Sequence, residues 1–139
     1  MRVKQKHDPK NCPDYVDRPH AHLLRQIDAV IEETPQLCEL VYHDLSASVD
    51  ADRGRRGMTA RQVLGAAITY HLWGDSYEDL AFRLADSSSY RRFCRVPIDA
   101  KPPGKSTLQE NIVRIRASTW ESICQVINHN AQRDGIEDG

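Results

Sequence analysis

A short predicted helix in the second half of the chain carries side chains suited to chemistry with nucleic acids. The segment KSTLQENIVRIR (105–116) follows helical spacing, and we expect its outward face to offer Gln109, Asn111 and Arg114. These residue types can form paired hydrogen bonds with the edges of adenine or guanine in the major groove of DNA. We therefore predict that this helix reads bases, through the set Thr107, Gln109, Asn111 and Arg114.

Groups that could bind phosphate surround the predicted reading helix. Ser106 and the N–H groups of the first turn could hold a phosphate, and lysines at 101 and 105 adjoin them. Arginines crowd the segment 91–95, and the linker GRRG (54–57) resembles the flexible basic arms that enter minor grooves. The predicted phosphate-binding set is Arg53, Arg55, Arg56, Arg91, Arg92, Arg95, Lys101, Lys105 and Ser106. The alternative is a small helical bundle whose surface is basic by chance.

Charge is unevenly distributed along the 139 residues, although the net charge is only -1. Residues 1–52 contain six Lys and Arg against ten Asp and Glu, residues 53–116 contain twelve against six, and residues 117–139 contain one against four. The three balances are -4, +6 and -3. A basic region between two acidic ends is typical of a module that faces a polyanion, and chance clustering is the alternative.

Patterns of catalytic and metal-binding residues are absent from the sequence. It contains no GxSxG elbow, no glycine-rich phosphate loop and no HExxH motif. The four cysteines form no CxxC pair, and His20 and His22 are too close in sequence to share one face of a helix. The acids of DGIEDG (134–139) are best interpreted as solvated charges at a helix end. We expect no catalytic residue, no metal, no cofactor and no small-molecule substrate.

The sequence gives no sign of a membrane or of secretion. No apolar run approaches the roughly 20 residues that a membrane-spanning helix needs. The charged start MRVKQKH is not followed by the apolar stretch of a secretory signal. We therefore expect a cytoplasmic location and no membrane partner.

Helical periodicity dominates the chain, and no segment alternates as a strand would. We predict an all-α fold of about seven helices, a helical bundle with a helix-turn-helix-like segment over 76–116. The hairpin that precedes it is expected to bury its two apolar stripes against each other and to use its acidic surface for protein contacts. The predicted regions are a mobile arm (1–18), an acidic helical hairpin (19–49), a basic linker (50–58), a helical DNA-binding domain (59–134) and a C-terminal tail (135–139).

Capping residues mark the predicted helix boundaries. A glycine at 74 should end one helix in the left-handed conformation. The spacings Ser-x-x-Gln at 106–109 and Ser-x-x-Glu at 118–121 predict two capping boxes. The predicted N-caps are Thr34 (followed by Pro35), Thr59, Ser76, Ser106 and Ser118.

Several blocks of sequence together resemble a known family. The most specific are GMTARQVL (57–64), SYEDLAFRLADS (76–87), RRFCR (91–95) and KPPGKSTLQENIVRI (101–115). They resemble the N-terminal helical region of a bacterial insertion-sequence transposase with DDE chemistry, of the ISNCY type, and the resemblance covers nearly the whole chain.

The resemblance implies a division of labour between two parts of a longer protein. In that family a catalytic domain of RNase H-like fold follows this region, and its three acids hold two Mg²⁺ ions. We expect the chain to stop before the first of those acids, so that no residue of this sequence takes a catalytic role. The implied function is recognition of the terminal inverted repeats of a transposable element in double-stranded DNA, at the bacterial nucleoid. A further copy or the full-length transposase is a possible partner, and the alternative is a non-catalytic dimerisation module that inhibits the transposase.

Overall fold

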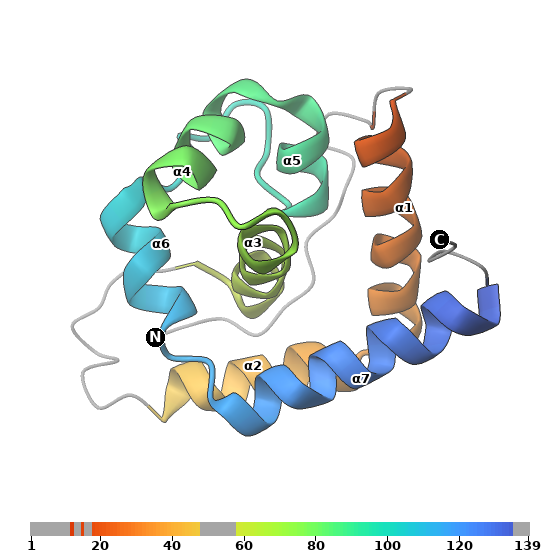
Figure 1. The fold of residues 1–139 in the computed structure, drawn as a ribbon. Helices are drawn as coiled ribbons and strands as arrows, with labels where there is room; N and C mark the ends of the chain where they lie inside the picture. Colours follow the sequence, from red (N-terminus) through yellow and green to blue (C-terminus); the bar gives the residue numbers. More distant parts are fainter. Residues whose placement is uncertain (1–11, 13–14, 16–17, 48–57, 135–139) are drawn as a thin grey trace.

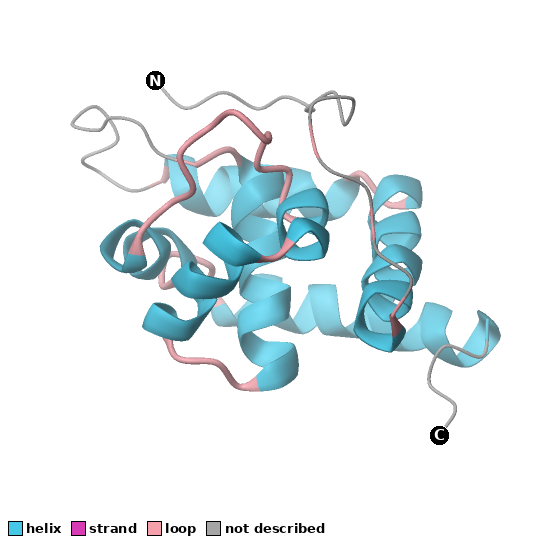
Figure 2. Cartoon of the chain, turned by 90° about the horizontal axis from the view of Figure 1, so that it is seen from above, coloured by secondary structure: helices cyan, strands magenta, loops and turns pink. Residues whose placement is uncertain are grey.

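The described part of the chain consists of helices joined by loops. The computed structural model describes residues 12, 15, 18–47 and 58–134, with side chains as far as residue 130. Figure 2 shows only helices and loops there, which confirms the all-α class. The helices are α1 (Pro19–Glu33), α2 (Gln36–Ser46), α3 (Ala60–Trp73), α4 (Tyr77–Asp86), α5 (Ser88–Phe93), α6 (Lys105–Ile112) and α7 (Ala117–Asp134).

Helix α3 is the centre of the fold, and the other helices surround it (Figure 1). Its residues from Ala60 to Thr69 are buried with one exception, because small and apolar side chains occur on every face of the segment. At Gly65 a Cβ atom would lie 2.9 Å from Nη1 of Arg61 and 3.0 Å from the carbonyl oxygen of Phe93. The missing side chain therefore permits the close approach of the end of α5.

The two N-terminal helices do not form the predicted hairpin. Helix α1 runs across the direction of α2 in Figure 1, and the two barely touch. Helix α1 packs against α5 and α7, whereas α2 packs against α3 and α7. Leu24 of α1 and Val41 of α2 belong to the same hydrophobic core as Leu64 of α3. The apolar faces of α1 and α2 are both buried as expected, but helices other than α1 and α2 cover them.

Local capping chemistry explains where the helices that flank the turn at Gly74 begin and end. The side chain of Thr59 accepts a hydrogen bond from the N–H of Gln62, and the Gln62 side chain bonds back to the N–H of Thr59. Gly74 adopts φ 66° and ψ 30°, and Ser76 accepts a hydrogen bond from the N–H of Asp79. The predicted caps at Thr59, Gly74 and Ser76 are confirmed.

Three other predicted caps are wrong. Thr34 follows the end of α1, and Pro35 occupies the N-cap position of α2 without a capping side chain. Helix α6 already begins at Lys105, so Ser106 lies inside it. Helix α7 begins at Ala117, which places Ser118 within its first turn. In each case the backbone enters the helix one or two residues away from the polar side chain, and the capping hydrogen bond is not formed.

Candidate nucleic-acid interface

Helix α6 presents a narrow polar face to solvent. Leu108 and Ile112 are buried, and the helix packs against α3 and α4. Because successive helical residues are about 100° apart, the residues one position on from these are turned away from the core. The exposed residues on this stretch are Lys105, Ser106, Gln109, Glu110 and Val113. The predicted outward positions of Ser106, Lys105 and Gln109 therefore agree with the structure.

Asn111 does not lie on the outward face of α6, and that part of the prediction is wrong. Its exposed fraction is 3%, and its Nδ2 donates to the carbonyl oxygen of Thr107 at 2.9 Å. It follows Leu108 by three residues, which places both on the side that faces the core. Thr107 and Arg114, the other members of the predicted base-reading set, are half-buried at the edges of the exposed face.

The N-terminal end of α6 is left without a side-chain cap. Gly104 is the N-cap residue and has no side chain. The predicted capping box between Ser106 and Gln109 is absent, because Ser106 lies inside the helix. The first intrahelical bond runs from the N–H of Leu108 to the carbonyl of Gly104. The N–H groups of the first turn point in the direction that binds anions at helix ends. Lys101 and Lys105 are exposed beside this end.

Arg91 holds the loop between α5 and α6 instead of pointing freely into solvent. Its Nε donates to the carbonyl oxygen of Leu84 at 3.0 Å, and its Nη1 donates to that of Pro97 at 2.8 Å. The same Nη1 lies 3.4 Å from the carbonyl oxygen of Ala100 and 3.5 Å from that of Ile98. The guanidinium thus bridges the end of α4 and the loop that leads to α6.

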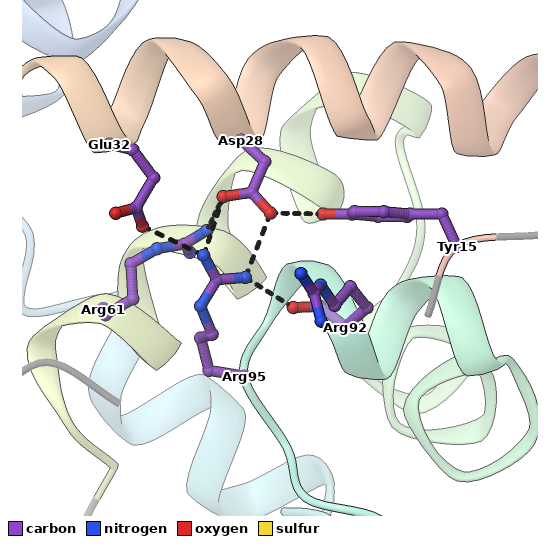
Figure 3. A network of polar contacts seen from close by, with 6 residues as sticks. All are labelled: Tyr15, Asp28, Glu32, Arg61, Arg92 and Arg95. Carbon is purple, nitrogen blue, oxygen red and sulfur yellow. Dashed lines mark hydrogen bonds and ion pairs between the residues drawn. The ribbon is translucent and has the colours of Figure 1, made fainter. Parts of the chain in front are cut away.

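Arg95 lies in the interior and is unavailable as the predicted phosphate contact. Only 4% of the residue is exposed. Its Nη1 and Nη2 donate to the two carboxylate oxygens of Asp28 at 3.0 and 2.8 Å, and Nη2 also reaches Glu32 at 3.0 Å (Figure 3). A residue that must sit in a buried ion pair cannot also contact DNA.

Asp28 is the centre of this buried network. Besides Arg95, it accepts hydrogen bonds from Nη2 of Arg61 at 3.1 Å and from the hydroxyl of Tyr15 at 2.5 Å (Figure 3). Burial acts to raise the pKa of Asp28, but the hydrogen bonds from Arg95 and Tyr15 and the charge of Arg61 outweigh it and hold the pKa below its ordinary value. Burial and the nearby Asp28 carboxylate raise the pKa of Tyr15. The network ties α1 to α3 and to the end of α5.

The backbone at Arg95 is also unusual. Its φ of 57° lies in the left-handed region, where glycine is the common residue. The N–H of the next residue, Val96, donates to the carbonyl of Arg91, which closes the end of α5. The ion pair with Asp28 and the bond from Gln62 Nε2 to the Arg95 carbonyl hold this conformation.

Arg92 is half-buried and lies beside Tyr15. Its guanidinium carbon lies 5.8 Å from the centre of the Tyr15 ring, and its carbonyl oxygen accepts a hydrogen bond from Arg95. Figure 3 places it beside Tyr15 at the edge of the network. The remaining predicted phosphate contacts, Arg53, Arg55 and Arg56, lie outside the described residues.

Acidic residues of the first two helices neutralise part of the basic region. Asp28 is paired with Arg61 and Arg95. Asp44 of α2 accepts the backbone N–H of Arg116 at 2.9 Å and lies 3.6 Å from its Nε. The excess positive charge of residues 53–116 therefore overstates what the surface offers to a polyanion. The sequence contains one signal that Asp28 pairs with a buried cation, since this residue falls on the apolar stripe between Ile27 and Ile31.

Two further findings concern other kinds of site. Among residues with described positions, no three His, Cys, Asp or Glu side chains gather as they would around a metal ion. No helix in the described ranges combines the length and apolarity that crossing a membrane requires.

Comparison with known proteins identifies a family. A family model described as "Transposase domain (DUF772)" matches residues 14–114. No curated protein and no solved structure matches the chain. The match includes α1 to α6, and so contains both the buried network and the exposed face of α6.

Proposed function

Since the chain belongs to the transposase-domain family DUF772, we propose that it binds double-stranded DNA and recognises the terminal inverted repeats of a transposable element. In this role the chain supplies recognition of DNA and takes no part in its cleavage. The role needs no metal and no cofactor. The proposed partners are the DNA and, in the assembled complex, a further copy or a full-length transposase.

The exposed face of α6 is the observation that carries the proposal. Gln109 is exposed on it, and glutamine can form two hydrogen bonds with adenine in the major groove. The uncapped end of α6, with Ser106 and the lysines at 101 and 105 beside it, suits a DNA phosphate. Base-reading and backbone-binding groups thus share one short helix, as in helix-turn-helix proteins.

The buried residues leave a smaller interface than the sequence suggests. We assign base reading to Gln109, with Thr107 and Arg114 at the edges of the same face. Phosphate binding is assigned to Ser106, Lys101 and Lys105. Arg92 stays a predicted phosphate contact at the edge of the interface, and the arginines at 53, 55 and 56 stay predicted phosphate contacts of a basic arm.

Affinity for duplex DNA should fall steeply as salt rises. Each neutralised phosphate contributes about -0.9 to the slope of log affinity against log salt concentration, because bound counterions are released. Lys105→Gln should make the slope shallower by about that amount. Arg25→Gln is the matched control, because Arg25 is exposed on α1, on the other side of α3 from α6 (Figure 1).

Fluorescence anisotropy from about 50 to 200 mM salt measures both slopes. An affinity that does not change with salt would contradict the proposal. Light scattering on the same samples distinguishes a DNA-binding protein from a pure dimerisation module. The latter would self-associate without salt-dependent DNA binding.

Gln109→Ala and Asn111→Ala should have different consequences although the two residues are neighbours on α6. Removing Gln109 should reduce discrimination between selected and scrambled duplexes by about 1–3 kcal/mol, with little change in stability. Asn111→Ala should leave discrimination unchanged and alter the unfolding free energy instead, because Asn111 is buried. Competition titrations and urea unfolding of both variants make the comparison. Unchanged discrimination in Gln109→Ala would contradict the base-reading role of α6.

A further inference from the structure

We propose that Arg91 is a positioning residue, which sets the sequence specificity of α6 by fixing the loop that leads into it. This inference rests on the proposed function. It assigns Arg91 a role different from that of a phosphate contact.

The loop between α5 and α6 is held to the end of α4 through one guanidinium group. Nε of Arg91 bonds to Leu84, in the last turns of α4, and Nη1 bonds to Pro97 in the loop. The carbonyl of Ala100 lies within 3.4 Å of the same Nη1, and the N–H of Ala100 closes a turn on the Pro97 carbonyl. With the carbonyl of Ile98 at 3.5 Å from the same Nη1, three loop carbonyls converge on one side chain.

Prolines limit the backbone hydrogen bonds that the loop can form. Prolines at 97, 102 and 103 lack an N–H group and cannot donate backbone hydrogen bonds. Gly104 provides no capping side chain for α6. Between Ala100, where Arg91 acts, and Lys105, where α6 begins, only four residues intervene, and two are conformationally restricted prolines. A displacement of the turn at 97–100 is therefore passed on to the first turn of α6.

Lysine cannot replace the guanidinium in this role. The planar fork of arginine donates in fixed directions to two separate segments, whereas an ammonium group is a compact charge on a flexible stem. A base contact depends on placing the side chain within a fraction of an ångström. Arg91→Lys keeps the positive charge and removes the bridge, so it separates positioning from charge.

The experiment uses the full chain and two duplexes of equal length and composition. One duplex carries the sequence that the wild-type protein enriches from a random pool, and the other is scrambled. For Arg91→Lys we expect the affinity ratio between the two duplexes to fall about tenfold, while scrambled-duplex affinity and salt slope stay unchanged. Arg83→Lys, an exposed arginine of α4 paired with Asp75, is the control and should keep the wild-type ratio.

A second variant covers the case in which Arg91→Lys does not fold. Ile98 is exposed, so Ile98→Gly loosens the same turn without removing core packing or charge. It should lower the affinity ratio in the same direction. The positioning role is overturned if Arg91→Lys folds and keeps the wild-type affinity ratio. If Arg91→Lys does not fold, the role is overturned when Ile98→Gly keeps that ratio. A wild-type protein that binds both duplexes equally would instead overturn the proposed function itself.

Discussion

Replacing Asp28 with asparagine should lower the free energy of unfolding by about 3–5 kcal/mol, because it leaves buried arginines without their counter-charge. Arg95 and Arg61 both donate to the Asp28 carboxylate, and the side chains of both are at least nine-tenths buried. Glu32 also contacts Arg95, but its side chain is largely exposed and cannot replace a buried carboxylate. The loss should also release the left-handed backbone at Arg95.

Urea unfolding followed by circular dichroism measures this change, and Asp44→Asn is the matched control. Asp44 is as buried as Asp28, but the side chain of its partner Arg116 is 67% exposed. Removing the charge of Asp44 therefore strands no buried cation, and the loss should be clearly smaller. Equal losses in the two variants would show that the arginines at 61 and 95 find water or other partners when Asp28 is neutral.

The same prediction has a pH dependence whose sign follows from the lowered pKa of Asp28. A carboxyl group whose pKa is lower in the folded state releases its proton more readily there, so its contribution to stability is complete above the unfolded pKa of about 3.9. The contribution is lost as the pH falls through the lower pKa of the folded state. Acid unfolding of the wild-type protein should contain this component, and that of Asp28→Asn should lack it.

Phe93→Ala should cost about 3–5 kcal/mol of unfolding free energy, as expected for a fully buried phenylalanine. Phe93 has an exposed fraction of 0%. The guanidinium carbon of Arg61 lies 5.3 Å from the ring centre, and Nε and Nη1 of Arg61 are buried without a hydrogen-bond partner. Truncation therefore removes both core volume and a cation–π contact with Arg61.

The other phenylalanine of the chain is the natural control for this variant. Phe82 lies on α4 with 66% of its surface exposed, so Phe82→Ala should change the unfolding free energy by no more than about 0.5 kcal/mol. Denaturant unfolding of both variants gives the comparison. A loss below about 1 kcal/mol for Phe93→Ala would mean that the core beneath Arg61 is loosely packed.

The sequence by itself determined the helices whose limits depend on neighbouring residues. Thr59 and Gln62 lie three positions apart and cap α3, and Gly74 ends it because a left-handed turn favours glycine. Ser76 begins α4 by the same short-range chemistry. Such contacts join residues within one turn of the chain, so residue type and spacing were sufficient to predict them. The recurrence of apolar side chains every three to four residues predicted the all-α class for the same reason.

The candidate site was predicted only in part. Gln109 and Asn111 are both polar residues of one short helix, and two positions along a helix place them on different faces. Which of the two meets solvent depends on where α3 and α4 pack, and the apolar Leu108 three positions before Asn111 was the local signal of its burial. Arg91 and Arg95 looked like surface cations because arginine usually is exposed.

Only the tertiary structure decided which charges remain at the surface. Arg95 meets Asp28 across 67 positions of sequence, and Arg61 meets it across 33. No local spacing encodes such a pair, because the partners come together only when α1 packs against the ends of α3 and α5. An ionised group enters a core only where a counter-charge offsets its lost hydration, so the packing of the helices selects the arginines that are buried and those left for a ligand.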